Sequence, residues 1–138
     1  MLILDTDHLA ELDRGSAAGR NLLSRLDTSG VEIVTTIISV EEQLRGWLAQ
    51  INRLRDPFRQ IDAYRRLQGR MDFFAAWRLL PWDSDAAGRY LTLKAEGIRI
   101  GAMDLKIASI AVAHGGTLLS RNLRDFQQVH GLAVEDWL

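Results

Sequence analysis

Four acidic side chains stand at places in the chain where they could meet and share a cation. Asp5 follows an apolar run at the N-terminus, and Glu42 lies just after a β-branched run. Asp104 and Asp125 flank an apolar segment that ends near residue 120. Taken singly, Glu42, Asp104 and Asp125 also have structural explanations, because acids cap helices and favour the first helical turn. Asp5 is harder to explain in this way, because the end of a buried strand is an unfavourable place for a free carboxylate.

The elements that would position these acids alternate along the chain. Short apolar or β-branched runs predict strands at residues 2–5, 31–36, 79–82, 117–120 and 132–137. Apolar spacing and capping signals predict helices that begin near residues 7, 17, 40, 57, 84 and 103, with a helical turn at 125–129. This alternation predicts an α/β fold, a three-layer α/β/α domain with a central, mainly parallel sheet of four to five strands and an inserted helical hairpin. We expect residues 1–138 to form a single domain.

Ligands of such sheets bind beyond the carboxyl ends of the strands. Asp5 ends the first predicted strand, and Glu42 lies on the first turns of the helix after the second. Asp104 begins the helix before the fourth strand, and Asp125 follows that strand after a short loop. All four acids can therefore converge at one edge of the sheet.

Two start signals frame the predicted hairpin. Ser39 has Glu42 three residues later, the spacing of a capping box, which predicts Ser39 as an N-cap. Asp56 precedes Pro57, which predicts a second helix with Asp56 as its N-cap. That helix carries an apolar stripe at a spacing of three or four residues: Phe58, Ile61, Tyr64, Leu67, Met71 and Phe74. Gly69 weakens its middle by about 1 kcal/mol relative to Ala, which allows a kink there.

Composition and charge narrow the class of protein. The 138 residues include no cysteine, which excludes disulfides and thiolate metal sites. No apolar run is long enough to span a bilayer and the N-terminus lacks a secretory pattern, so we expect a cytoplasmic protein. Residues 45–70 carry seven arginines and two aspartates, a net charge of +5, although the whole chain has a net charge of −1. Such a segment can steer a polyanion, or it can be simply the solvated face of two helices.

Four motifs, quoted in chain order, carry a resemblance to a known family. They are LILDTDHL at residues 2–9, ISVEEQLRG at 38–46, IGAMDLKIASIAVAHG at 100–115 and LLSRNLRDF at 118–126. Together they cover the chain almost from end to end. They resemble the motifs of the PIN domain and, within it, of the VapC-type toxins of bacterial toxin–antitoxin pairs.

The resemblance implies a set of site residues. It assigns Asp5, Glu42, Asp104 and Asp125 to a divalent-metal site that is also the catalytic site, with Thr6, Ser120 and Asn122 as supporting polar groups. Glu42 is preferred to Glu41 because Gly46 lies four residues after it, as in the family's second motif. Asp7 departs from the family's pattern, where Asn is more frequent, and it either adds charge to the site or caps the first helix.

The physical chemistry of clustered carboxylates agrees with this assignment. Two carboxylates about 4 Å apart repel by roughly 4 kcal/mol at an effective dielectric constant near 20. Four of them therefore need a counter-cation, and oxygen ligands without Cys or His favour Mg²⁺ or Mn²⁺ over zinc. Such a site binds a phosphate oxygen and lowers the pKa of a bound water that attacks phosphorus.

The resemblance also implies an activity and partners. It implies an endoribonuclease that leaves a 5′-phosphate and a 3′-hydroxyl and so inhibits translation or growth, with a cognate antitoxin and a homodimeric assembly. Arginine suits phosphate because its guanidinium donates in pairs, so Arg45, Arg121 and Arg124 are candidates for binding the RNA backbone. Their alternative is a role in ion pairs or at helix ends. Trp47, one turn beyond Glu42, is the tryptophan expected to contact a partner.

Two other readings stay open on the sequence alone. Asp5 and Asp7 have the Asp-x-Asp spacing of the haloacid-dehalogenase-like phosphatases, although a Gly-Asp-x-x-x-Asp metal motif is missing. A PIN-like module that only binds RNA or protein is the second alternative. His8 and His130 are both expected on the surface, because a metal-activated water needs no histidine.

Overall fold

The computed structural model describes all 138 residues and has a central sheet of five parallel strands. The strands are β1 (Leu2–Leu4), β2 (Ile33–Thr36), β3 (Leu79–Leu80), β4 (Thr117–Leu119) and β5 (Ala133–Glu135). Their order across the sheet is β3-β2-β1-β4-β5, so the N-terminal strand lies in the middle. The prediction of an α/β fold with a parallel sheet is confirmed.

Seven helices connect the strands. They are α1 (Thr6–Arg14), α2 (Ala17–Ser29), α3 (Ile37–Arg53), α4 (Pro57–Ala75), α5 (Ser84–Ala95), α6 (Ala102–His114) and α7 (Leu123–Phe126). The last helix, predicted at 125–129, begins two residues earlier and ends three residues earlier. The second strand, predicted at 31–36, begins two residues later and ends where it was predicted to end.

Alternate residues of β1 separate two cores on opposite faces of the sheet. Ile3 packs with the buried residues of α5 and α6, among them Leu93 and Ile107. Leu2 and Leu4 point the other way and pack with residues of α1, α2 and the end of α4. Because neighbouring side chains of a strand face opposite sides of a sheet, this pattern builds the expected helix–sheet–helix layering.

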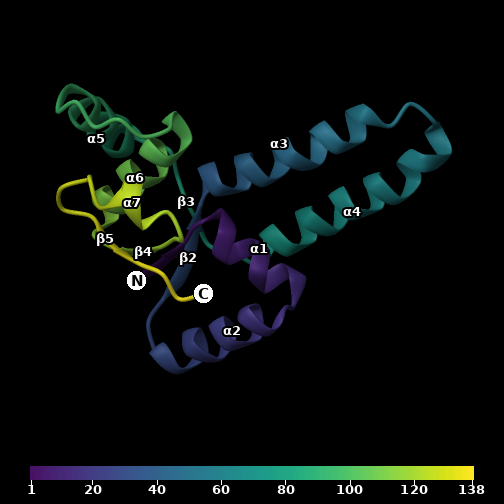
Figure 1. Ribbon diagram of the computed structural model, residues 1–138, viewed down its shortest axis with the longest axis horizontal. Coiled ribbons are helices and arrows are strands. Elements are labelled where there is room, and N and C mark those ends of the chain that lie inside the picture. The colour runs from purple at the N-terminus through teal and green to yellow at the C-terminus, as the bar shows by residue number, and fades with distance from the viewer.

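Helices α3 and α4 form an antiparallel arm that projects away from the sheet (Figure 1). The start of α3 differs from the prediction, because Thr36 is the N-cap and its hydroxyl accepts a 3.0 Å bond from the Ser39 amide. Ser39 is thus a buried residue inside the helix, and the capping box with Glu42 is wrong. Asp56 caps α4 with Pro57 at its first position, as predicted.

The apolar stripe of α4 faces solvent along most of its length. Helix α4 runs without interruption through Gly69, yet only Phe74, near its end, is buried. Phe58 is 82% exposed, and Ile61, Tyr64 and Met71 are exposed as well. The far end of the arm lies beyond reach of the sheet, so this side of the stripe has no core to pack against (Figure 1).

The N-terminal helices approach each other unusually closely. A Cβ atom at Gly19 would lie 2.1 Å from the backbone oxygen of Glu11, so only glycine allows α2 to pack this tightly on α1. This contact fixes the direction of α1, whose first residues carry part of the candidate site. None of the seven helices has the length and apolarity needed to cross a membrane.

Candidate active site

Asp5 lies between the central strand and the first helix. It follows β1 directly and is the N-cap of α1, with its carboxylate accepting from the Thr6 amide. The same carboxylate accepts a hydrogen bond from the hydroxyl of Ser120, which follows the neighbouring strand β4. Asp5 and Ser120 are both buried, so the two parallel strands end in one shared polar contact.

Glu42 reaches the same region from the arm. Its Oε2 accepts a 2.5 Å hydrogen bond from Thr6 Oγ1, and Glu42 itself is half-buried. Thr6 therefore joins the two acids, because its backbone amide binds Asp5 and its hydroxyl binds Glu42. This bond, and not a capping box, accounts for the position of the Glu42 side chain.

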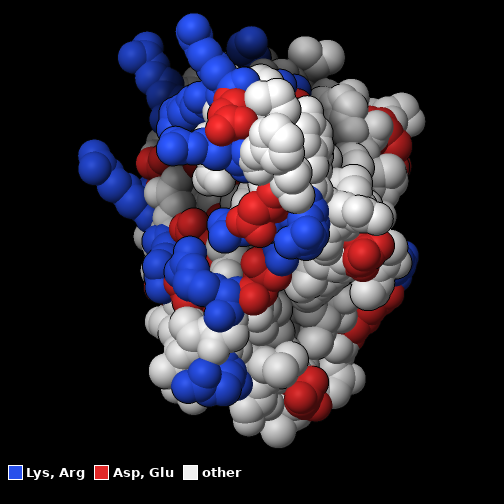
Figure 2. All heavy atoms as spheres, turned by 90° about the vertical axis from the view of Figure 1, so that its right-hand side faces the viewer, with Lys and Arg blue, Asp and Glu red and all other residues white.

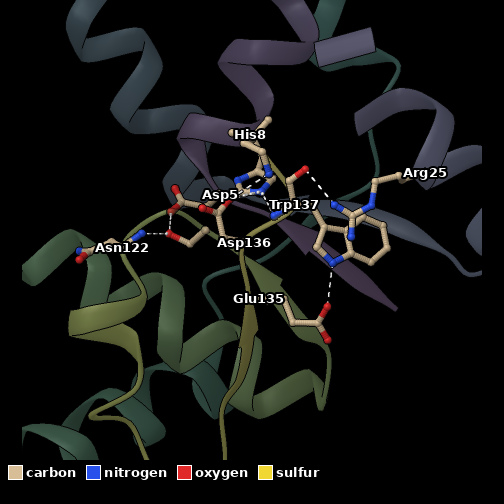
Figure 3. Close-up of polar contacts among 9 residues, drawn as sticks. Asp5, His8, Arg25, Asn122, Glu135, Asp136 and Trp137 are labelled. Carbon is tan, nitrogen blue, oxygen red and sulfur yellow. Dashed lines mark hydrogen bonds and ion pairs between the residues drawn. The ribbon is translucent and has the colours of Figure 1, made fainter. Parts of the chain in front are cut away.

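Asn122 joins the other two acids. Its side-chain nitrogen donates to Asp104 Oδ2 and to Asp125 Oδ2, each at 3.0 Å. Its backbone nitrogen donates to the Ser120 hydroxyl at 3.1 Å, and that hydroxyl binds Asp5 (Figure 3). A continuous set of hydrogen bonds thus runs from Asp5 through Ser120 and Asn122 to both Asp104 and Asp125.

The acids are close enough to perturb one another. Burial raises the pKa of Asp5 to about 6, and the charges of Asp7 and Asp104 add to the rise against the hydrogen bond from Ser120. Burial also raises the pKa of Glu42, with Asp104 and Asp7 contributing further. For Asp104, burial is again the main cause of a raised pKa, followed by the charges of Asp125 and Asp7. Asp7 thus acts electrostatically on three of these acids.

The charge of this group has no cationic counterpart in the chain. None of the six ion pairs involves Asp5, Glu42, Asp104 or Asp125, whose side-chain partners are neutral hydroxyl and amide groups. In this conformation no three acidic or histidine side chains are grouped tightly enough to hold one ion. The donor set nevertheless fits a hard cation, because all four acids offer carboxylate oxygens and repel one another.

His8 corrects the expectation of a surface position. Its side chain is fully buried, and Nε2 accepts a 3.2 Å hydrogen bond from the backbone nitrogen of Trp137 (Figure 3). Burial lowers the pKa of His8 to about 4, against the attraction of Asp136 at 3.6 Å. His8 is therefore neutral at pH 7 and fastens the C-terminal segment to α1. His130 is exposed, as expected.

The three arginines proposed for the RNA backbone differ in their surroundings. Arg45 forms a 2.7 Å ion pair with Glu41 on the exposed side of α3, which supports the structural alternative for this residue. Arg121 and Arg124 are exposed next to Asn122 and Asp125, and neither forms an ion pair. Both can therefore approach a bound polyanion.

A cavity beside Glu42 was missed by the sequence analysis. It has a volume of about 290 Å³ and lies between α1, α3 and α4, with Glu42, Trp47, Gln50 and Arg70 among its lining residues. Gln43, Trp47 and Gln50 recur at helical spacing, and this was the only signal of a shared face. Arg70 lines the cavity only because α4 folds back along α3. The sequence around Arg70 gave no signal of this position.

Comparison with known proteins identifies the family. No family model matches the chain. The VapC ribonuclease Y4jK of Sinorhizobium fredii is 30% identical to it over 143 positions, which cover 99% of this chain and 98% of that protein. The chain belongs to the VapC family of PIN-domain ribonucleases.

Another VapC protein agrees with this membership, and solved structures have the same fold. Ribonuclease VapC2 of Haemophilus influenzae is 29% identical and covers 85% of the chain and 84% of that protein. The structure of VapBC-1 from nontypeable Haemophilus influenzae matches with a TM-score of 0.75 at 20% identity, over 99% of this chain and 97% of that chain. FitAcB from Neisseria gonorrhoeae matches with a TM-score of 0.70 at 26% identity, over 99% of this chain and 98% of that one.

Membership in the VapC family decides between two readings of the N-terminal acids. The PIN-type fold expected from the four motifs is confirmed. A haloacid-dehalogenase-like phosphatase with Asp5 and Asp7 as its catalytic pair is not supported. Asp7 instead lies in the first turn of α1, where its charge adds to that of the other acids.

Proposed function

We propose that this chain is a divalent-metal-dependent endoribonuclease and the toxin of a VapBC-type pair, acting as one domain that spans residues 1–138. The observation that carries the proposal is the group formed by Asp5, Glu42, Asp104 and Asp125. These acids are joined by neutral donors and have no partner in an ion pair, and burial together with neighbouring acids raises the pKa of Asp5, Glu42 and Asp104. Membership in the VapC ribonuclease family supports the same activity.

The cofactor of the proposed reaction is Mg²⁺ or Mn²⁺, held by the four carboxylates. When bound, such an ion neutralises charge on a phosphate and provides a water of lowered pKa for attack on phosphorus. Thr6, Ser120 and Asn122 keep the carboxylates in place, because each donates at least one hydrogen bond to them. Ordered donors of this kind orient metal ligands and tune their basicity.

The proposed substrate is RNA. Arg121 and Arg124 are exposed beside the site and would bind the phosphate backbone on either side of the cleaved bond. One relative, over 47% of this chain and at 32% identity, is named a tRNA(fMet)-specific endonuclease VapC. Hydrolysis of cellular RNA by this chain would inhibit translation and growth.

The experiment that tests the activity compares wild type with Asp5→Asn and Asp104→Asn. We expect cleavage of RNA to 5′-phosphate and 3′-hydroxyl ends that requires Mg²⁺ or Mn²⁺ and falls at least 100-fold in both variants. Asp72→Asn is the matched control, because Asp72 is an exposed acid of α4 outside the site. Cleavage at the wild-type rate by either site variant would contradict the metal site. Folded wild type without activity on any RNA would favour a module that only binds.

A thermal melt tests cation binding without activity. Binding to the folded state raises the melting temperature. We therefore expect Mn²⁺ or Mg²⁺ to raise the melting temperature of wild type and to have a much smaller effect on Asp104→Asn. An equal rise in both proteins would show that the cation binds elsewhere.

The proposed protein partner is a cognate antitoxin that covers the α3–α4 arm. Several solved structures with this fold are toxin–antitoxin complexes. The exposed stripe of Phe58, Ile61 and Tyr64 lies in a segment of net charge +5, so it suits a partner with apolar and acidic side chains. Figure 2, which views the molecule from the arm's end, shows Lys and Arg side chains gathered in its upper part. Phe58→Ser combined with Ile61→Ser is expected to weaken antitoxin binding at least tenfold in a titration and to leave RNA cleavage intact.

We also propose that the chain forms a homodimer through a different surface. An apolar groove of about 550 Å³ runs along α3 near Trp82 and includes Leu44 and Leu48. Glu41 and Arg45 lie on its rim, so a two-fold axis can place the acid of one copy opposite the base of the other. Leu48→Glu is expected to shift the protein from dimer to monomer in sedimentation experiments, and an unchanged dimer would contradict this surface.

A further inference from the structure

The cavity beside Glu42 has a lining unlike that of a metal or phosphate site. On the α3 side Gln43, Trp47 and Gln50 line it, at a spacing of four and three residues that places them on one face of the helix. Thr6 and Glu42, two residues of the acidic site, also line it. The cavity and the site thus share a wall.

Arg70 closes the cavity from α4 and is fixed in place. Its side chain is only 17% exposed and pairs with Asp13 of α1. The guanidinium also lies 5.8 Å from the ring centre of Trp47 and 5.4 Å from that of Phe73. A cation held by an acid and two aromatic rings gives the pocket a rigid back.

The basic charges of the cavity are balanced inside the chain. Asp13 neutralises Arg70, and Glu11 binds Arg14 at 2.5 Å. Apart from Glu42, which belongs to the acidic site, the cavity therefore offers a ligand an indole ring, two carboxamides and a largely buried guanidinium whose charge is already compensated. A planar, uncharged ligand with hydrogen-bonding edges fits this lining, whereas a phosphate would find no free cation.

The position of the cavity relative to Glu42 identifies that ligand further. Along α3, Gln50 lies eight residues after Glu42, which is about 12 Å at 1.5 Å per residue. A group in the cavity is thus close enough to belong to the same substrate as the phosphate at the acidic site. In a polynucleotide, the planar group next to a phosphate is a base.

We propose that this cavity binds one nucleobase of the RNA next to the cleaved phosphate and so sets the sequence preference of the enzyme. Trp47 provides the stacking surface, and the amides of Gln43 and Gln50 bind the edge of the base. An apolar side chain of a protein partner would bind better on the exposed stripe of Phe58, Ile61 and Tyr64, and a cationic one would compete with Arg70 for Asp13. The proposal rests on the ribonuclease function proposed above.

Gly46 provides a way to fill the cavity without disturbing the fold. It lines the cavity on α3, and a Cβ atom there would meet no other atom within 4 Å. Gly46→Leu therefore directs a side chain into the space meant for the base, while replacing Gly inside a helix favours the helix. Gly69→Leu is the matched control, because Gly69 is also helical, exposed and free of contacts, but lies outside the cavity.

In the experiment, the enzyme cleaves single-stranded RNA that has randomised positions, and the cleaved ends are then sequenced. We expect wild type to prefer certain bases at one position beside the cut. Gly46→Leu and Trp47→Leu should lose that preference and raise KM for the preferred RNA about tenfold, the scale of one stacked base. Gln50→Glu should change which base is preferred, and Gly69→Leu should behave as wild type. The affinities of wild type and the variants for labelled RNA, measured without divalent cation, should rank in the same order as their KM values.

Three outcomes would overturn the inference. If wild type cleaves RNA and Gly46→Leu retains its base preference, the cavity does not bind a base, although the ribonuclease function stands. If Gly46→Leu cleaves RNA normally but no longer binds the antitoxin, the cavity belongs to the protein partner. If folded wild type cleaves no RNA in the presence of Mg²⁺ or Mn²⁺, the proposed function and the inference fail together.

Discussion

Asp5 is a residue at which stability and the proposed function oppose each other. Burial raises its pKa to about 6, so between pH 4 and pH 6 the folded chain holds a proton that the unfolded chain has released. The stability that this proton gives is complete below the unfolded pKa of 3.8 and is lost as the pH rises through 6. A carboxylate that is present although its ionisation lowers the stability of the cation-free protein is typical of a functional site.

The prediction for Asp5 concerns its neutral isostere. Asn keeps the N-cap of α1 and removes the buried charge. Without divalent cations, Asp5→Asn should be more stable than wild type by about 2–3 kcal/mol at pH 8, and the difference should vanish near pH 4. Urea unfolding in EDTA at both pH values measures it. A variant that is less stable than wild type at pH 8 would contradict the burial argument.

His8 has the opposite pH dependence. Its pKa is lowered to about 4, so below pH 6.5 the unfolded chain binds a proton that the folded chain rejects. The contribution of the neutral His8 to the stability of the folded chain is complete above pH 6.5 and is lost as the pH falls through 4. We predict that His8→Gln flattens the fall in unfolding free energy between pH 6.5 and pH 4, measured against wild type. His130→Gln, at an exposed position, should leave the curve unchanged.

At the scale of elements, the contact of α1 with α2 depends on one glycine. Adding a methyl group at Gly19 places a carbon 2.1 Å from the backbone of Glu11, which does not move as a side chain would. We predict that Gly19→Ala lowers the unfolding free energy by about 1–3 kcal/mol or more. Gly88→Ala, in open space on α5, should be neutral or slightly stabilising. Equal effects of the two changes in denaturant unfolding would contradict the close packing.

The elements also show what could be predicted from the sequence. The end of a strand is a local feature of the sequence. The position of Asp5 at the end of β1 and the succession of helices and strands along the chain could therefore be predicted from apolar runs and turn residues. The N-cap of α3 was misplaced because Thr36 and Ser39 both suit an N-cap, and only the register of β2 decides between them. The burial of His8 had no local signal, because its partner Trp137 is 129 residues away. The exposed stripe of α4 was equally unpredictable, since periodicity does not say which partner covers a face.

At the scale of the whole molecule, the arm combines positive charge with the edge of an acidic site. Arg59 and Arg65 of α4 are exposed and form no ion pair, so both are free to attract a polyanion. We predict that replacing both by Gln weakens binding of single-stranded RNA at low salt. The slope of log K against log salt should become less negative by about 1.4, while kcat at saturating RNA stays unchanged. Replacing Arg89 and Arg99, which lie outside the arm, is the control.

The strand order has a consequence for folding during synthesis on the ribosome. The first strand made, β1, lies in the centre of the sheet and must wait for β4, made more than 110 residues later, before one of its two edges is paired. Asp104 and Asp125 also belong to the last third of the chain. The central strand and the four-acid site therefore stay incomplete until β4 and Asp125 have been made. Because the proposed cleavage of RNA needs all four acids, we expect no activity from nascent chains that lack these residues.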